Sequence, residues 1–298
     1  MGQKLCWQNF VKTNPKHQNA HMISGKTKII AHLGYPTESF KAPMIYNPYF
    51  EDRGIDAVVV PMGAKPENYA DVLKAVFSLS NIAGALITMP HKMTTVGLLD
   101  DVSTTVKIAG ACNAVRRSGD GKLIGDMFDG EGFARGVLRK GKVLKGAKAY
   151  VLGSGGVGSA IVASLAAAGV VKLGLKDFSP ESAEALGARI KLHYPQIEVV
   201  TGSDDLAGFD IIVNATPIGM KDGDPLPFEM ERISSKMFVG EVVMKQEHTP
   251  FLQAAMAKGC QIQLGTDMLF EQIPAYLEFF GFPTTTPEEL RRLATIKY

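Results

Sequence analysis

The chain has 298 residues, 46% of them hydrophobic and 21% charged, which is typical of a globular protein with one large or two medium domains and excludes a disordered or fibrous one. The 32 Lys and Arg residues nearly balance the 30 Asp and Glu residues, and with a net charge of +2 and no long basic run the chain is not expected to bind nucleic acid. Glycine accounts for 31 residues, an excess that favours an α/β protein with tight turns and close backbone approaches to a nucleotide.

The N-terminal segment is polar and has no sustained apolar period, so we expect residues 1–24 to be a leader or tag-like extension, with Met22 as a candidate natural start. The segment lacks the apolar stretch of a secretory signal, and no window approaches 18 uninterrupted apolar residues, so no membrane association is expected. Cys6, Cys112 and Cys260 are widely spaced and match no zinc or redox motif. We therefore expect a cytoplasmic protein without a metal site.

From Lys28 the pattern changes to short apolar runs typical of strands, at residues 29–33, 55–60 and 83–88. Between the last two runs, apolar residues from 69 to 77 recur at helical spacing. This strand–helix–strand order predicts a parallel sheet.

A second block alternates strand and helix patterns from Ala147 to about Leu264 and predicts an open doubly wound sheet. Its strand-like apolar runs cover residues 147–152, 171–176, 197–201, 211–213 and 237–243, and residues 159–165 form the apolar segment of its first helix.

The C-terminal part of the chain predicts two helices. Residues 269–280 form an apolar run of helical length. Residues 286–290 read Thr-Pro-Glu-Glu-Leu, which predicts a capping box with Pro287 at the first helical position.

A glycine-rich turn lies between the first strand and the first helix of the second block. It consists of Gly153, Ser154, Gly155, Gly156, Val157 and Gly158, and it satisfies the G-x-G-x-x-G pattern of dinucleotide-binding proteins. In this setting the first glycine makes the turn, the second lets the backbone approach a pyrophosphate, and the third lets helix and strand pack closely. We interpret these six residues as cofactor-binding, although a glycine turn of this kind is in some proteins only structural.

Asp177 ends the next predicted strand, about 20 residues after the motif, where an acid accepts hydrogen bonds from the adenosine ribose. Its carboxylate would repel a 2′-phosphate, and the following Phe178, Ser179 and Pro180 offer no arginine to hold one. The sequence therefore predicts NAD as the cofactor, with Asp177 and Phe178 at its adenosine end; the alternative is that Asp177 serves only as a turn or cap residue.

Four stretches resemble the shikimate/quinate dehydrogenase family, and the likeness extends from about Gly34 to Gly281. They are residues 87–92 (Ile-Thr-Met-Pro-His-Lys), 110–115 (Gly-Ala-Cys-Asn-Ala-Val), 214–220 (Asn-Ala-Thr-Pro-Ile-Gly-Met) and 265–272 (Gly-Thr-Asp-Met-Leu-Phe-Glu-Gln). The resemblance implies a two-domain α/β fold: an N-terminal α/β substrate domain, completed by the C-terminal helices, with a Rossmann-type doubly wound parallel sheet inserted between. We expect residues 25–130 and 265–298 to form the substrate domain and residues 131–264 the NAD-binding domain.

The family likeness also implies the reactive groups. Oxidising a secondary alcohol requires a base that takes the hydroxyl proton while hydride leaves for a nicotinamide ring. Lys92 is the candidate for proton transfer and Asp129 matches the family aspartate that would orient it, whereas His91 is expected only to pack or to be solvated. The alternative is that Lys92 and Asp129 form an ordinary surface ion pair.

Other matched positions imply ligand contacts. Thr88, Asn113 and Gln272 match substrate contacts of the family. The positions assigned to the cofactor by the same likeness are Asn214, Ala215, Thr216, Pro217, Gly265 and Met268.

The chain departs from the family where the substrate carboxylate is held. The family's Ser-x-Ser-Pro is Phe40-Lys41-Ala42-Pro43 here, its Asn-Val-Thr begins with Leu86, and Met244 replaces a tyrosine. An apolar wall would desolvate a carboxylate without replacing its hydrogen bonds, so we expect a substrate pocket altered at Phe40, Ala42 and Leu86. The alternative is compensation by a shifted loop carrying Lys41 or a nearby hydroxyl.

Together these observations predict an NAD-dependent dehydrogenase of the shikimate/quinate type, linked to aromatic amino acid biosynthesis and acting on shikimate, quinate or a less polar relative, as a monomer or homodimer. A catalytically weak ligand- and nucleotide-binding sensor of the same fold is the main alternative. A dehydrogenase of the methylenetetrahydrofolate type is disfavoured by the motif at residues 214–220.

Overall fold

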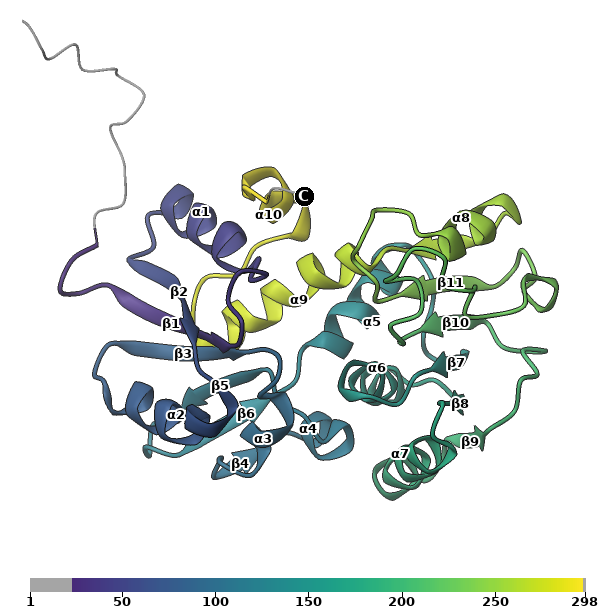
Figure 1. Ribbon diagram of the computed structural model, residues 1–298, viewed down its shortest axis with the longest axis horizontal. Coiled ribbons are helices and arrows are strands. Elements are labelled where there is room, and N and C mark those ends of the chain that lie inside the picture. Colours follow the sequence, from purple (N-terminus) through teal and green to yellow (C-terminus); the bar gives the residue numbers. More distant parts are fainter. Residues whose placement is uncertain (1–22, 297–298) are drawn as a thin grey trace, which may run out of the picture.

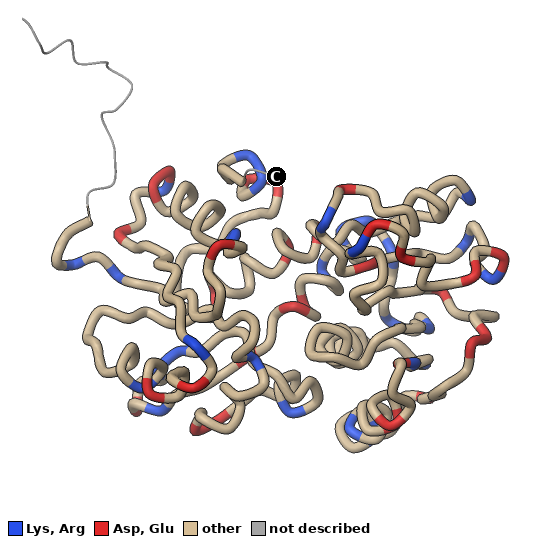
Figure 2. The backbone as a smooth tube through the Cα atoms, viewed as in Figure 1, with Lys and Arg blue, Asp and Glu red and all other residues tan. Residues whose placement is uncertain are grey.

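The computed structural model describes residues 23–296, which form two six-stranded sheets that lie side by side with helices around them (Figure 1). The predicted leader, residues 1–24, lies outside the described residues except for Ile23 and Ser24. No helix within residues 23–296 combines the length and the hydropathy needed to cross a bilayer. Lys and Arg are interspersed with Asp and Glu along both halves of the described chain (Figure 2).

The first sheet has the strand order β2-β1-β3-β5-β6-β4. Its strands are β1 (Lys28–Gly34), β2 (Ala57–Gly63), β3 (Ile82–Ile87), β4 (Asp101–Val102), β5 (Ala114–Arg117) and β6 (Leu123–Asp126). Strands β1, β2 and β3 are parallel as predicted, but β5 runs antiparallel to both β3 and β6. The predicted parallel arrangement is therefore confirmed for the three strands that it covered. Strand β5 was not among the predicted runs, and the short turn at residues 118–122 allows only an antiparallel pairing with β6.

The second sheet has the order β12-β11-β10-β7-β8-β9, and all its pairs are parallel, as the sequence predicted. Its strands are β7 (Lys148–Leu152), β8 (Lys172–Lys176), β9 (Glu198–Thr201), β10 (Ile211–Asn214), β11 (Phe238–Glu241) and β12 (Gln261–Gln263). Alternate residues of β7 enter different cores: Ala149 and Val151 pack under helix α6 (Gly156–Ala167), whereas Tyr150 and Leu152 pack under α8 (Pro250–Ala257). Both faces of the sheet are thus covered, which makes it doubly wound.

Eight further helical segments connect and cover the strands. They are α1 (Pro43–Arg53), α2 (Tyr69–Ser78), α3 (Lys92–Val96), α4 (Thr104–Ala109), α5 (Asp129–Arg139), α7 (Pro180–His193), α9 (Gly265–Phe280) and α10 (Pro287–Leu293), together with two short 3₁₀ turns, Pro66–Asn68 and Met230–Arg232.

Helix α9 joins the two halves of the molecule (Figure 1). Met268 in its first turns belongs to the core of the second sheet, whereas Ile273 and Leu277 belong to the core that covers the first sheet. The helix begins at Gly265, four residues before the predicted Leu269. Its first turn carries no apolar pattern that would have predicted it, and Asp267 caps the helix by accepting a hydrogen bond from the Leu264 amide at 3.1 Å.

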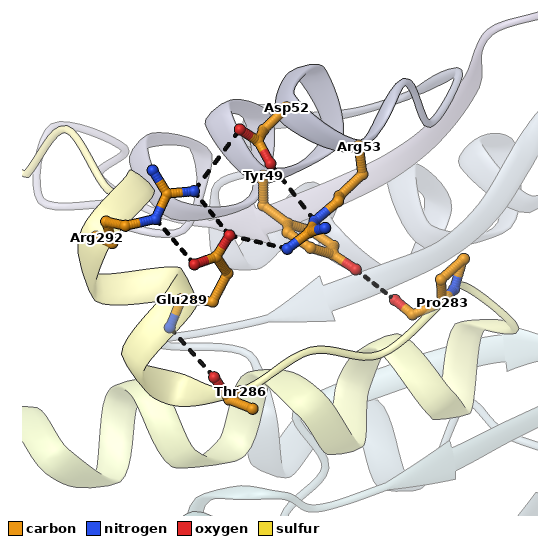
Figure 3. Close-up of polar contacts among 7 residues, drawn as sticks. All are labelled: Tyr49, Asp52, Arg53, Pro283, Thr286, Glu289 and Arg292. Atoms are coloured by element: carbon orange, nitrogen blue, oxygen red, sulfur yellow. Dashed lines mark hydrogen bonds and ion pairs between the residues drawn. The ribbon is translucent and has the colours of Figure 1, made fainter.

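The C-terminal helix α10 lies against α1 at the other end of the chain (Figure 3). Tyr49 Oη donates to the Pro283 carbonyl at 2.8 Å, and Arg53 Nη2 contacts Glu289 Oε1 at 2.8 Å. The C-terminal helices therefore pack on the first sheet although the second sheet precedes them in the chain. The division into residues 25–130 with 265–298 and residues 131–264 stays a prediction, and its boundary at residue 130 falls within α5 (Asp129–Arg139).

Helix α10 begins as the sequence predicted, with one difference at its cap. Thr286 Oγ1 accepts from the Glu289 amide at 3.3 Å, and Pro287 occupies the first turn. Glu289 does not complete the capping box, because its carboxylate instead pairs with Arg53 and with Arg292 (Figure 3). The tertiary contact to α1 thus replaces the second half of a local motif.

Candidate active site

A cavity of about 330 Å³ lies at the carboxyl ends of β1 and β3, next to the first turn of α6. This is the edge at which parallel α/β sheets bind ligands. Seven of the eight residues predicted for catalysis or substrate binding line it: Phe40, Ala42, Leu86, Thr88, Lys92, Asp129 and Gln272. Val157 of the glycine motif and Met268 of α9 line it too, so the cavity borders the predicted cofactor site.

Lys92 and Asp129 line the cavity and form an ion pair with each other. Lys92 is the first residue of α3 and Asp129 the first of α5, and Lys92 Nζ lies 2.5 Å from Asp129 Oδ2. The side chains are 21% and 7% exposed, so this is a largely buried pair rather than the ordinary surface ion pair considered from the sequence. The carboxylate also lies at a helix N-terminus, where the helix dipole favours a negative charge.

Asn113 supports this pair from behind. It is fully buried, its Nδ2 donates to Asp129 Oδ1 at 3.0 Å, and its Oδ1 accepts from the Phe128 amide at 2.9 Å. It does not line the cavity, in contrast to its predicted role as a substrate ligand. In this structure the amide holds Asp129 in the orientation that leaves the other carboxylate oxygen for Lys92.

His91 packs in the core, as expected. Its ring stacks on Tyr69 with centroids 3.9 Å apart, and Nε2 lies 2.7 Å from the Ala64 carbonyl oxygen. The side chain is almost fully buried and is not among the residues that line the cavity.

His32 is a cavity residue that the sequence reasoning missed. It lies on β1 beside Leu86 of β3, and its ring stacks on Phe40 with centroids 4.1 Å apart. Burial, and to a smaller extent the charge of Lys92, lowers the pKa of His32 to about 4. A polar residue within the apolar run 29–33, just before the strand ends, is the sequence feature that marked it.

Two tyrosines of the cavity were also missed. Tyr46 of α1 and Tyr276 of α9 both line it, and burial raises the pKa of each phenol well above its usual value. They come from helices more than 200 residues apart in the chain, and nothing in the local pattern of either segment marks it as a site.

The glycine turn has the geometry that a dinucleotide requires. Gly153 has φ +108°, a conformation that favours glycine, and a Cβ added to it would lie 2.7 Å from the Ala215 carbonyl oxygen. A Cβ on Gly158 would lie 2.1 Å from the Gly153 oxygen, whereas a Cβ on Gly155 would meet no atom within 4 Å. The first and third glycines therefore serve packing, and the second borders open space beside the helix N-terminus.

A buried polar atom of the same turn also lacks a partner. Ser154 Oγ makes no hydrogen bond within residues 23–296, although it is buried. Together with the open space at Gly155, this is the arrangement expected of a turn that holds a phosphate-bearing ligand.

Asp177 follows β8 and contacts the glycine turn directly. Its Oδ2 accepts from the Ser154 amide at 2.6 Å and its Oδ1 from the Ser179 amide at 3.0 Å. Phe178 beside it is 79% exposed. The carboxylate thus orders the turn, the structural role considered from the sequence, and lies where an adenosine ribose would reach it.

The remaining cofactor positions surround the turn. Asn214 Oδ1 accepts from the Thr216 amide at 3.1 Å, and Asn214 Nδ2 donates to the Ile218 carbonyl, which fixes the loop of Ala215 and the exposed Pro217 after β10. A Cβ on Gly265 would lie 2.2 Å from the Val243 carbonyl oxygen, so α9 begins in close contact with the segment after β11.

Comparison with known proteins agrees with this architecture. The family model described as "Shikimate dehydrogenase substrate binding domain" matches residues 33–115. A shikimate dehydrogenase (NADP(+)) from Acidiphilium cryptum is 31% identical over 272 residues, which cover 91% of this chain and 97% of that protein.

Two solved structures illustrate the range of similar proteins. Quinate dehydrogenase from Corynebacterium glutamicum in complex with NAD has a TM-score of 0.81 and 27% identity, over 90% of this chain and 98% of that one. The ligand-free 5-ketofructose reductase of Gluconobacter sp. strain CHM43 has a TM-score of 0.83 and 26% identity, over 91% and 98%.

Proposed function

This chain belongs to the shikimate dehydrogenase family and is an oxidoreductase of the shikimate/quinate dehydrogenase type, and we propose that it is NAD-dependent, with Lys92 and Asp129 as its catalytic pair. The observation that carries the proposal is the Lys92–Asp129 contact of 2.5 Å in a cavity that also contains Val157 of the glycine turn. An alcohol bound beside Lys92 would lie next to the cofactor's site, as hydride transfer requires.

The residues of the site divide the chemistry between them. When bound, the nicotinamide cofactor accepts or supplies the hydride. Lys92 Nζ exchanges the proton of the substrate oxygen: it gives the proton to a carbonyl in reduction and receives it from a hydroxyl in oxidation. Asp129, held by Asn113, keeps the Lys92 ammonium in place and balances its charge. Thr88 and Gln272 are proposed to hold other oxygens of the substrate.

The Lys92→Met variant tests this assignment. We expect kcat to fall by about 10²- to 10⁴-fold, because proton transfer contributes about that much. Cofactor affinity, measured by calorimetry, should stay the same, since Lys92 is not proposed to contact the dinucleotide. Lys74→Met, at an exposed position of α2, is the matched control. An unchanged kcat in Lys92→Met would contradict the proposal.

The preference for NAD rests on Asp177 and Phe178. A carboxylate that already accepts two backbone amides is fixed beside the turn, and it would repel a 2′-phosphate. The Acidiphilium relative is named for NADP(+) and the Corynebacterium structure contains NAD, so the family uses both. Replacing Asp177 by Ser and Phe178 by Arg should shift the ratio of kcat/KM for NAD over NADP toward NADP by about 100-fold, as expected for a gained charge-assisted contact and a lost repulsion.

Glu184→Gln, at an exposed position of the following helix α7, is the control for that experiment. It removes one negative charge from the same region without touching the turn. An equal shift in both variants, or a wild-type protein that prefers NADP, would contradict the assignment.

The substrate pocket is proposed to be altered at Phe40, Ala42 and Leu86. Restoring hydroxyls with the double substitution Phe40→Ser and Ala42→Ser should raise kcat/KM for shikimate by about tenfold or more, since each satisfied hydrogen bond to a charged group contributes about 1.5 to 3 kcal/mol. Efficient wild-type turnover of shikimate would show that the pocket is not altered in function. The name of the Gluconobacter protein indicates that a similar fold accepts an uncharged sugar.

A further inference from the structure

The altered end of the cavity is built around His32. Phe40, which replaces a family serine, stacks on the imidazole at a centroid distance of 4.1 Å. Leu86, another departure from the family, lies beside His32 in the register of β1 and β3. These two departures therefore enclose one buried histidine, whose side chain is only 8% exposed.

Three polar atoms of the residues that line the cavity lack a hydrogen-bond partner within residues 23–296. They are His32 Nδ1, Tyr46 Oη and Gln272 Oε1, from β1, α1 and α9. Most buried polar atoms of folded proteins are paired, and an unpaired one costs stability. Because all three atoms belong to residues that line one cavity, we take them as the groups that a bound ligand would complete.

All three of these groups are uncharged at neutral pH. Burial lowers the pKa of His32 to about 4, and it raises the pKa of Tyr46 well above its usual value. The amide of Gln272 carries no charge, and the ammonium of Lys92 is paired with Asp129.

A carboxylate placed among these three groups would lose water and gain no charged partner from any of them. A hydroxyl or carbonyl is less strongly hydrated, and a neutral imidazole, a phenol and an amide together offer it both donors and acceptors. The aromatic face of Phe40 and the side chain of Leu86 would at the same time cover C–H surface of the ligand.

We infer that the substrate is an uncharged polyhydroxy alcohol or ketone, and that the His32 end of the cavity binds one of its hydroxyl or carbonyl groups in place of a carboxylate. This inference rests on the proposed dehydrogenase function and narrows its substrate. In oxidation the carbinol C–H bond breaks and its electron pair leaves with the hydrogen as hydride to the nicotinamide. The O–H proton passes to Lys92 Nζ in its unprotonated amine form, which becomes the ammonium paired with Asp129, and a ketone remains.

The test compares ligands that differ only in charge at one end. The full chain is assayed with NAD and with NADP on shikimate, on methyl shikimate and on the analogue in which hydroxymethyl replaces the carboxylate. We expect kcat/KM for the better neutral compound to exceed that for shikimate by about tenfold or more, as for a site whose polar groups discriminate between substrates. A ratio of one or below would overturn the inference while leaving the dehydrogenase function intact.

A second measurement separates this inference from the dehydrogenase function. If neither cofactor is reduced with any compound, the proposed function fails, and calorimetry of the same compounds then decides the inference alone. Tighter binding of a neutral compound than of shikimate supports it, and equal or weaker binding overturns it.

The variant His32→Leu tests the residue itself. We expect KM for the neutral compound to rise by about tenfold, with a smaller change for shikimate, whereas His193→Leu at the end of α7 should change neither. Lys41 also lines the cavity, so Lys41→Gln tests the opposing explanation. A loss of shikimate activity in Lys41→Gln together with an unchanged preference in His32→Leu would overturn the assignment.

Discussion

Replacing His32 with glutamine is expected to remove part of the acid sensitivity of the folded protein. Burial and the nearby charge of Lys92 lower the pKa of this histidine to about 4 in the folded state, from 6.5 for an unperturbed histidine. The unfolded chain therefore binds the proton more tightly than the folded one. Stability is fully retained above the unfolded value and falls as the pH decreases from 6.5 to about 4.

The size of this effect follows from the two pKa values. At about pH 5 the unfolded state gains about 2 kcal/mol from protonating His32, whereas at about pH 7.5 the gain is close to zero. Urea unfolding of the wild type and of His32→Gln at both pH values measures this difference, and titrations of other groups cancel between the two proteins. The wild type should lose about 2 kcal/mol more than the variant on going to the lower pH.

Equal losses in the two proteins would refute this reasoning, because they would mean that His32 keeps an ordinary pKa in the folded state. The same result would remove the argument that His32 is uncharged at neutral pH, and with it one support of the inferred substrate class.

Three further predictions concern other parts of the fold. Gly158→Ala should destabilise the protein by about 2 kcal/mol or more, since the new Cβ would lie 2.1 Å from a backbone oxygen. Gly155→Ala should leave stability nearly unchanged but weaken nucleotide binding. Urea unfolding measures the stability and calorimetry the binding, and equal stability of the two variants would contradict the packing argument. Thr286→Ala should cost about 1 kcal/mol through the lost helix cap, measured by urea unfolding, and no change would show that the contacts of α10 with α1 suffice to hold the helix. Arg139→Ala should lower the free energy of unfolding by about 1 to 3 kcal/mol, because the Glu271 side chain is 5% exposed and would lose its charged partner. A smaller loss in urea unfolding, close to that of a surface ion pair, would mean that Glu271 becomes hydrated or neutral in the variant.

Local patterns predicted most of the secondary structure. Five apolar runs of the second block, at 147–152, 171–176, 197–201, 211–213 and 237–243, predicted strands that are observed with small shifts at their ends, because buried parallel strands are continuous apolar segments. The helix start at Thr286 was predicted because its cap is contained in four consecutive residues. The first turn of α9 was missed because its polar residues Gly265, Thr266 and Asp267 interrupt the apolar pattern.

Neither β5 nor its direction was predicted in this way, because its four residues, Ala114–Arg117, end in two arginines and form no apolar run. An apolar run indicates a strand but carries no information on which neighbour it joins. The pairing of β5 with β3 and β6 depends on contacts formed after the chain has turned back at residues 118–122.

The residues of the candidate site also fall into those that local sequence patterns predicted and those that only the folded structure revealed. The sequence by itself determined the glycine turn and the presence of Lys92, Asp129 and Asp177, because each lies in a short motif whose chemistry depends on neighbouring residues. Only the tertiary structure decided that Asn113 lies behind Asp129 rather than in the cavity.

The tertiary structure likewise decided that His32, Tyr46 and Tyr276 share the cavity with Phe40 and Leu86. These residues come from two strands, two helices and a loop, and none of them contacts the others through the local chain geometry that a sequence pattern records. The unpaired atoms and shifted pKa values of His32 and Tyr46 arise from burial, which depends on how the elements pack. The sequence therefore predicted where the reaction takes place, and the packing of distant segments decided the chemical character of the pocket beside it.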